Sequence, residues 1–367
     1  MDSINYIFNY IDDFPLLVKS TLWFSGILAL VILILILYLR LIRLHLRIKD
    51  NEIKTLKSEY ETLLVEYLYS GNSTEDLTEN QLSIISRLKT EVTIKSRRKI
   101  IVLILYKLMS EVSGEMSEAA KTFYFKTGLF EFALNGLKSK KWHIISKAIG
   151  ELRRFQVVEV QNQIKPLITH PVREVRKEAH LYFVSLFQFD GLMFLNHIKT
   201  PLTEWDQLQI LGILQRFDKQ DICDIKPWLK SSNPTVVLFA LKLAKVYNQF
   251  EVNDVLIDLL SHENQDIRIY TIEVLTSLYG IEAKEVLKAN FNELSIEEQL
   301  CFFEMLEKLV VPTDEPFIEK HLFHKDFEIQ LLALKILKSI NLDKFLGLKE
   351  LATNKEKSNM YKFVNNG

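Results

Sequence analysis

The amino-acid sequence predicts an all-α fold: an α-solenoid of helical hairpins, preceded by one transmembrane helix and a helical stalk. The first observation behind this fold class is an apolar pattern in the C-terminal part of the chain that recurs with a regular period, as in helical-repeat proteins. The second is a stretch of 18 uncharged residues near the N-terminus. The third is the small number of turn residues, because 11 glycines and eight prolines are few for 367 residues and favour helices.

The bulk composition limits the function classes. A chain of this length forms two or three compact domains or one extended array. The 46 basic and 47 acidic residues give a net charge of −1, which argues against a dedicated nucleic-acid binder. The two cysteines, Cys223 and Cys301, have no metal-binding or disulfide spacing and fit a reducing compartment.

The uncharged stretch predicts a transmembrane helix over residues 21–42. Its 18 residues, 22–39, would extend roughly 27 Å as a helix, close to the hydrocarbon thickness of a bilayer. A buried core helix is the alternative, but such a helix rarely stays apolar on every face for five turns. A cleaved signal peptide is disfavoured, because acidic residues precede the stretch and no small-residue cleavage site follows it.

The charges on either side of this helix predict its orientation. Net charge is −2 before the span and +4 in the ten residues after it. By the positive-inside rule, residues 1–20 form a short extracytoplasmic segment and the bulk of the chain is cytoplasmic. The expected location is therefore the cell (inner) membrane, with a single pass. The residues that flank the anchor on the cytoplasmic side are Arg40, Arg43, Arg47 and Lys49.

Three further segments are expected before the repeats. Residues 43–70 carry apolar side chains at three-, four- and seven-residue steps and predict a helical stalk, through which two copies of the chain could pair as a coiled coil. Residues 71–94 begin with a polar break and are interpreted as a polar linker. Residues 95–137 predict a pair of helices that is out of register with the repeats and caps them at the N-terminal side.

The repeats occupy residues 138–353 and comprise about seven units with a period of roughly 31 residues. A flexible tail is expected over residues 354–367. Most units have a small or apolar residue at a reference position, with apolar residues one, three and four positions later. His180 breaks the pattern one position after Ala179, and Glu151 breaks it three positions after Ala148. The reference residues are Ala148, Ala179, Ile210, Ala240, Thr271, Phe302 and Ala333. A second apolar cluster lies between successive references, at Leu167, Ile198, Leu229, Leu259, Phe291 and Leu322. Each period is therefore expected to hold two helices of roughly eleven to fourteen residues.

The starts of the repeated helices resemble those of HEAT repeats, in which a polar or proline turn precedes a Val-Arg pair and then alanine. The pattern is clear at residues 170–179 (HPVREVRKEA), and the arginine is lost at Val237 and Gln330. The resemblance covers residues 95–352 and implies a right-handed α-solenoid of HEAT-like hairpins that binds partner proteins along its groove. The period is shorter than that of longer HEAT units.

A second resemblance concerns residues 125–142, FKTGLFEFALNGLKSKKW. This segment is similar to that of bacterial membrane HEAT proteins which accompany envelope polysaccharide glycosyltransferases. The resemblance implies a non-catalytic scaffold or adaptor that assembles or positions such a membrane synthase. Two alternatives remain open at this point: a HEAT-fold enzyme of lyase or base-excision type, and a signalling or regulatory adaptor at the membrane.

The sequence predicts no catalytic, cofactor-binding or metal-binding residue, and therefore no enzyme. Gly-rich phosphate loops, nucleophile elbows and zinc-protease helices are missing from it. His321 and His324 lie one helical turn apart but lack a third ligand at a suitable spacing. Glu304 and Glu307 are also one turn apart and are expected to form a solvated face.

Charge is unevenly distributed along the array. Residues 95–154 contain 13 basic against five acidic residues, and residues 250–350 contain ten against 20. Because the cytoplasmic face of a membrane is usually anionic, the basic end is expected to bind phospholipid or an acidic partner surface. The candidate residues are Lys138, Lys140, Lys141, Lys147, Arg153 and Arg154.

Overall fold

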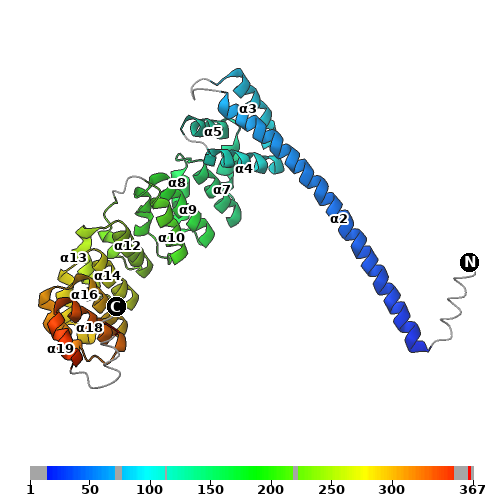
Figure 1. Ribbon diagram of the computed structural model, residues 1–367. Helices are drawn as coiled ribbons and strands as arrows, with labels where there is room; N and C mark the ends of the chain where they lie inside the picture. Colours follow the sequence, from blue (N-terminus) through cyan, green and yellow to red (C-terminus); the bar gives the residue numbers. More distant parts are fainter. Residues whose placement is uncertain (1–14, 71–76, 112–113, 218–221, 351–362, 365–367) are drawn as a thin grey trace, which may run out of the picture. The chain divides into compact units, whose positions relative to one another are not determined.

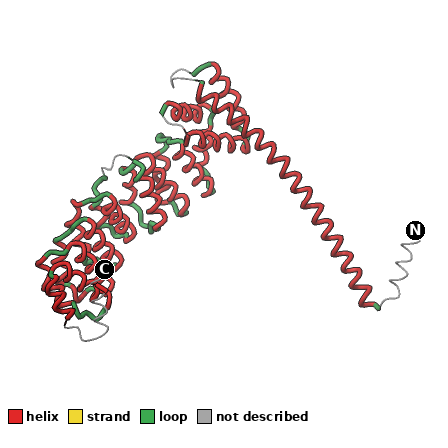
Figure 2. The backbone as a smooth tube through the Cα atoms, viewed as in Figure 1, coloured by secondary structure: helices red, strands yellow, loops and turns green. Residues whose placement is uncertain are grey.

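The structure is a computed structural model that describes residues 15–70, 77–111, 114–217, 222–350 and 363–364. Every regular element in these ranges is a helix (Figure 2). The all-α solenoid with one long apolar helix near its N-terminus is thus confirmed. The chain forms two compact units, residues 1–132 and 133–367. The predicted extracytoplasmic segment lies outside the described residues except for residues 15–20.

The first unit is built on one helix of 54 residues, α2 (Leu16–Tyr69), which continues without a break from the apolar segment into the predicted stalk (Figure 1). At 1.5 Å per residue it is roughly 80 Å long. None of its most apolar 18-residue window is buried within the protein. By length and composition this is the one described helix that could cross a membrane.

The C-terminal end of α2 packs within its own unit. This end buries Tyr60, Leu64, Tyr67 and Leu68, and α2 contacts α3 (Glu79–Val92), α4 (Lys95–Glu111) and α5 (Glu115–Lys126). The Tyr67 and Phe123 rings meet edge to face at 5.1 Å. Part of the apolar seam that suggested a coiled coil is therefore covered by the same chain. A homodimer through the stalk stays a prediction. The part of α2 before Tyr60 is largely exposed, and Val65 and Tyr69 are exposed beyond it.

The interpretation of residues 71–94 as a linker was wrong for most of its length, because they contain helix α3 (Glu79–Val92). A capping box starts this helix: Thr78 Oγ accepts from the Gln81 N–H at 3.2 Å, and Gln81 Oε1 accepts from the Thr78 N–H at 3.0 Å. Its apolar side chains follow helical spacing and are buried: Ile84, Ile85, Leu88 and Val92. The polar residues before the helix concealed this pattern.

The predicted capping pair consists of three helices: α4 (Lys95–Glu111), α5 (Glu115–Lys126) and α6 (Leu129–Leu137). The second expected helix is split at Gly128, whose φ of +80° lies in the left-handed region that glycine tolerates. Thr127 precedes this turn and donates its hydroxyl to the carbonyl of Phe123 at 2.7 Å. The chain therefore changes direction at Thr127–Gly128 instead of continuing as one helix.

The second unit contains a series of long helices, which lie side by side in chain order in Figure 1. They are α7 (Trp142–Arg154), α9 (Arg173–Phe187), α10 (Glu204–Leu214), α12 (Pro234–Val246), α14 (Gln265–Ser277), α16 (Ile296–Leu309) and α18 (Phe327–Ile340). All seven reference residues of the sequence pattern lie on these helices, and each is buried. The apolar register therefore marks the face on which successive helices pack.

The second element of each repeat is shorter than predicted. The α-helices are α8 (Gln161–Ile164), α11 (Lys226–Leu229), α13 (Asn253–Leu259), α15 (Glu282–Ala289), α17 (Glu315–His321) and α19 (Leu342–Glu350). Five 3-10 turns accompany or replace them: Lys165–Thr169, Asp190–Asn196, Phe250–Val252, Phe291–Glu293 and Pro312–Asp314. The longest first helix, α9, has 15 residues. Such a helix takes about half of the repeat period, and the two turns then shorten the second helix.

The turns that start the long helices repeat a polar pattern. The N-cap position holds Thr203, Asn233, Asn264, Ser295 and Asp326, each of which accepts a hydrogen bond from the first turn of its helix. Near the starts of α9, α10, α14, α16 and α18, a side chain donates to a backbone carbonyl of the turn before the helix: Arg176, Gln207, Arg268, Gln299 and Gln330, in that order. Arg176 and Arg268 are the arginines of the HEAT-like pattern, and glutamine performs the same role elsewhere.

Most of the predicted tail lies outside the described residues. Within the described part, Val364 is buried, and its carbonyl accepts a hydrogen bond from Lys338 Nζ at 2.8 Å.

Candidate interaction surface

Four of the six predicted basic residues lie together at the start of the second unit. Lys138, Lys140 and Lys141 occupy the loop between α6 and α7, and Lys147 lies on α7. All four are exposed. No hydrogen bond or ion pair among the described residues involves the ammonium group of any of them. Their positive charges therefore face solvent without an acidic partner.

The two arginines at the end of α7 differ from these lysines. Arg153 NH2 lies 3.2 Å from Glu178 Oε2 on α9, and both side chains are largely covered. Arg153 thus joins two successive helices and is committed within the chain. Arg154 is exposed and also has an interaction partner. The lysines, rather than the arginines, form the free part of the predicted basic site.

Sequence reasoning missed two apolar residues in this region. Trp142 is the first residue of α7 and is 47 % exposed, and Ile144 in the same turn is 38 % exposed. The opposite face of α7 is buried through Ile145, Ala148 and Ile149. Because Trp142 and Ile144 contribute little to that core, they form an apolar surface next to the lysines. The sequence signal for this surface is KKWHII at residues 140–145, in which a tryptophan, a histidine and two isoleucines directly follow two lysines.

The predicted anchor flank lies on α2, directly after its apolar part. Arg40, Arg43, Arg47 and Lys49 are all exposed. They continue the same helix without a turn, so the change from apolar to basic residues occurs along one rigid element.

The acidic end of the array contains a buried ion pair. Lys284 on α15 and Asp314 are each about 1 % exposed, and Lys284 Nζ lies 2.9 Å from Asp314 Oδ2. Lys288 Nζ contacts the other carboxylate oxygen at 2.5 Å. Burial raises the pKa of Asp314, but hydrogen bonds from Lys288, the Val311 N–H and Lys284 outweigh it and hold that pKa below its usual value. Lys284 lies on α15, and Asp314 lies in the 3-10 turn that follows α16. The ion pair therefore joins two successive repeats.

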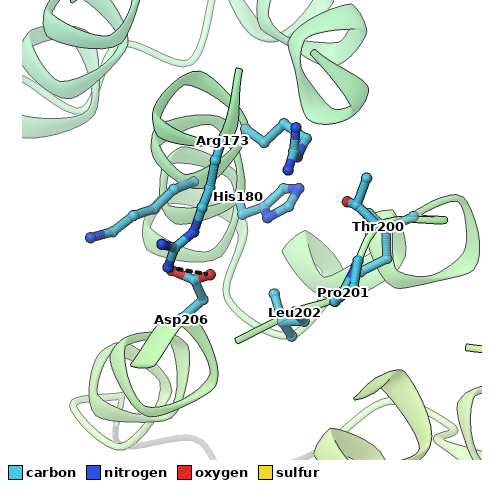
Figure 3. A pocket seen from close by; sticks show the side chains of 9 residues that line it. Arg173, His180, Thr200, Pro201, Leu202 and Asp206 are labelled. Carbon is cyan, nitrogen blue, oxygen red and sulfur yellow. Dashed lines mark hydrogen bonds and ion pairs between the residues drawn. The ribbon is translucent and has the colours of Figure 1, made fainter. Parts of the chain in front are cut away.

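A small polar cavity lies between α9 and the turn before α10 (Figure 3). Arg173, Arg176, His180, Thr200, Leu202 and Asp206 are among its lining residues. Arg173 NH2 lies 3.2 Å from Asp206 Oδ2, and the pair is drawn as a dashed line in Figure 3. The cavity volume is about 10 Å³, which is room for one water molecule but not for a metabolite.

His180 forms the buried wall of this cavity. Its ring stacks on Phe194 at 4.2 Å, and its Nε2 lies 3.1 Å from the carbonyl of Ile168. Burial lowers the pKa of His180 to about 4. The imidazole is therefore neutral near pH 7 and is held by packing and one backbone contact.

Three of the four residues considered for metal binding or acid–base chemistry have structural partners. His321 Nδ1 lies 2.8 Å from the carbonyl of Phe317, and His324 Nδ1 accepts from the Asp326 N–H at 3.1 Å. Glu307 lies 3.9 Å from Lys335, while Glu304 is exposed. No group of three or more His, Cys, Asp or Glu side chains suited to a metal ion occurs in the described part of the chain.

The two cysteines are unreactive by environment. Burial raises the pKa of Cys223 to about 11 and that of Cys301 to about 12. Since the thiolate is the nucleophilic form, neither thiol is activated for nucleophilic chemistry near neutral pH.

No protein-family model matches the chain, and no curated protein matches it. Among solved structures, the chain is similar to an engineered protein (16% identity, 83% of this chain and 97% of that chain covered, TM-score 0.37). It is also similar to human deoxyhypusine hydroxylase in complex with glycerol (12% identity, 79% and 98% covered, TM-score 0.29). A second engineered protein has 16% identity over 77% of this chain and 97% of its own, with a TM-score of 0.18. Likenesses this weak carry no argument about function.

Proposed function

We propose that the protein is a membrane-anchored, non-catalytic scaffold whose helical array binds a partner protein on the cytoplasmic side. The observation that carries this proposal is the exposed apolar half of α2, which continues as one helix into the packed part of the first unit. A helix that is apolar on all faces and buried by nothing in its own chain needs a lipid environment or an apolar partner.

The charges support the orientation of the anchor. Arg40, Arg43, Arg47 and Lys49 follow the apolar segment on the side of the two folded units, and the positive-inside rule places that side in the cytoplasm. Both cysteines are unpaired, which agrees with a reducing compartment.

The array supports a binding role. Stacked repeats present long surfaces whose stability comes from contacts between neighbours, so surface residues are free to vary for binding. Exposed apolar side chains on long helices of the array are suited to partner contacts, among them Trp205, Leu208, Ile296 and Phe327. The cavity described above is too small for a metabolite, and no observation favours an enzyme over a scaffold.

The partner class that we propose comes from the resemblance of residues 125–142: a membrane-bound glycosyltransferase of envelope polysaccharide synthesis. Such an enzyme is itself held at the membrane, where an anchored scaffold meets it at a raised effective concentration.

The test is photo-crosslinking in intact membranes of the native organism. A photoreactive amino acid replaces Trp205 on α10 or Phe327 on α18, both more than half exposed. Replacement of Leu46 on the stalk, also exposed, is the control. The proposal expects the array positions, and not the stalk position, to capture a membrane glycosyltransferase or a subunit of its complex. Capture of no protein at either array position, or equal capture at Leu46, contradicts it.

A further inference from the structure

We infer that the start of the second unit binds anionic lipid headgroups as a second membrane contact of this chain. The site is the α7 patch, which consists of Lys138, Lys140, Lys141, Trp142, Ile144 and Lys147. The inference rests on the proposed membrane anchor and adds to it a specific lipid chemistry. It assigns no protein partner to these residues.

The charge of the α7 patch is not balanced by ion pairs among the residues that the structure describes. Residues 132–150 contain four lysines and no aspartate or glutamate. All four lysines are exposed, and their ammonium groups have no partner among the described residues. The lysines are therefore available to several headgroup phosphates at once, each of which they attract electrostatically.

The stability of α7 does not explain these lysines. Lys141 occupies the N-cap position and provides no side-chain hydrogen bond to the helix. The equivalent residue caps five later helices, for example Asn264 at α14 and Ser295 at α16. Cations near a helix N-terminus are also unfavourable to the helix dipole. A polar cap would stabilise α7 more than lysine does, so the stability of the helix does not account for lysine at this position; the N-cap of α9, Val172, likewise provides no side-chain cap.

The apolar members of the patch favour a bilayer over an acidic protein. Trp142 is half exposed at the first position of α7, and Ile144 lies in the same turn. Tryptophan is enriched at the level of the headgroups, where its ring is partly apolar and its N–H stays hydrated. Basic side chains beside exposed Trp and Ile are the composition of interfacial membrane contacts. The anchor and the patch belong to one chain, so binding of the patch to lipid is an intramolecular step once the chain is anchored.

The experiment uses the full chain in lipid nanodiscs and follows the fluorescence of Trp142. Trp23 lies within the apolar segment, so the background variant is Trp23→Phe. The fluorescence emission of Trp142 is obtained by subtracting the emission of the Trp23→Phe/Trp142→Phe variant from that of the Trp23→Phe background. Brominated phosphatidylglycerol or brominated phosphatidylcholine quenches a tryptophan that inserts among the lipids. Charge reversal (Lys138→Glu, Lys140→Glu, Lys141→Glu, Lys147→Glu) is compared with the matched Lys→Arg set, and circular dichroism checks that both sets are folded.

We expect brominated phosphatidylglycerol to lower the Trp142 emission at least twofold, and brominated phosphatidylcholine alone to leave it largely unaffected. Charge reversal should restore the emission, whereas the Lys→Arg set should remain quenched. Unquenched Trp142 in anionic nanodiscs, or equal quenching in both lipids, overturns the inference. A chain that enters nanodiscs with unquenched Trp142 contradicts only the lipid contact. A chain that fails to enter nanodiscs contradicts the proposed anchor as well.

Discussion

His262 Nδ1 accepts a hydrogen bond from the backbone N–H of Asn264 at 3.0 Å. In equivalent turns of other repeats, His170 Nδ1 accepts from the N–H of Val172 and His324 Nδ1 accepts from the N–H of Asp326, each at 3.1 Å. In a fourth turn Ser231 Oγ accepts from the Asn233 N–H at 3.2 Å. Three of the eight histidines therefore have one repeated structural task, which is to hold the turn that precedes a long helix.

The first prediction concerns this turn. His262→Ala removes the acceptor for the Asn264 N–H and should lower the free energy of unfolding by about 1 kcal/mol. His262→Ser should lose less, since serine performs this role at Ser231. Urea unfolding of the full chain in mild detergent measures both. Equal stability of the alanine variant and the parent would show that the contact contributes nothing.

The second prediction concerns His180 and pH. Burial lowers its pKa from 6.5 to about 4; to a smaller extent the charge of Asp206 raises this pKa and that of Arg176 lowers it. Arg173 and Lys177 line the same cavity. Between pH 6.5 and 4 the unfolded chain binds a proton at this position and the folded chain does not, so stability is lost as the pH falls through that window, by up to about 3 kcal/mol. His180→Gln should make the loss of stability between pH 7 and pH 4.5 smaller, and an unchanged pH dependence would contradict the assignment. The pKa of His321 is also lowered, mainly by burial, and contributes to both proteins alike.

The third prediction concerns the buried pair Lys284 and Asp314. Asp314→Ala leaves the Lys284 ammonium buried without its carboxylate, which should cost about 3–5 kcal/mol. Lys284→Met/Asp314→Leu removes the two fully buried charges, and Lys288, which also contacts Asp314, keeps Glu285 as its partner at 2.7 Å. The double variant should therefore recover most of that loss. The urea midpoints of the two variants give the comparison. A double variant no more stable than Asp314→Ala would mean that packing, not charge, sets the cost.

The fourth prediction separates two roles of Tyr67. Its ring is fully buried against Phe123, whereas its hydroxyl is buried with no partner in the described part of the chain. Burial raises the pKa of this phenol to about 12. Tyr67→Phe keeps the ring and should leave stability unchanged or raise it by about 1 kcal/mol, while Tyr67→Ala should cost about 3–5 kcal/mol. Thermal melting of both variants tests this, and a marked loss in Tyr67→Phe would reveal a hydrogen bond to water.

Much of the fold was predictable from single positions. The reference residues Ala148 and Phe302 differ in size, yet both are buried, because the repeat period places each on the face that packs against the neighbouring repeat. The short second helices were not predictable in the same way. Leu229 and Leu259 are buried at the ends of short α-helices, whereas Ile198 is buried in a loop and Phe291 in a 3-10 segment. Burial alone therefore does not fix helix length.

The candidate site was predictable only in part, because a list of charges does not show which are paired. Arg153 and Lys147 look alike in the sequence, but Arg153 contacts Glu178, which is 25 residues away on α9, the next long helix. Trp142 was overlooked because an aromatic residue at the start of a helix is usually part of a core, and only the orientation of α7 exposes it. Pairing across repeats and the rotation of each helix depend on tertiary packing.

The central claim is that residues 22–39 of α2 hold the chain in a membrane, and alkaline carbonate extraction of native membranes tests it most directly. The account predicts that the full chain stays in the membrane pellet, with an intact mass that still includes this segment. Leu30→Arg/Leu33→Arg, which places two charges in the exposed apolar stretch, should appear in the soluble fraction. Release of the unaltered chain by carbonate, or a mature form that lacks residues 22–39, would contradict the account.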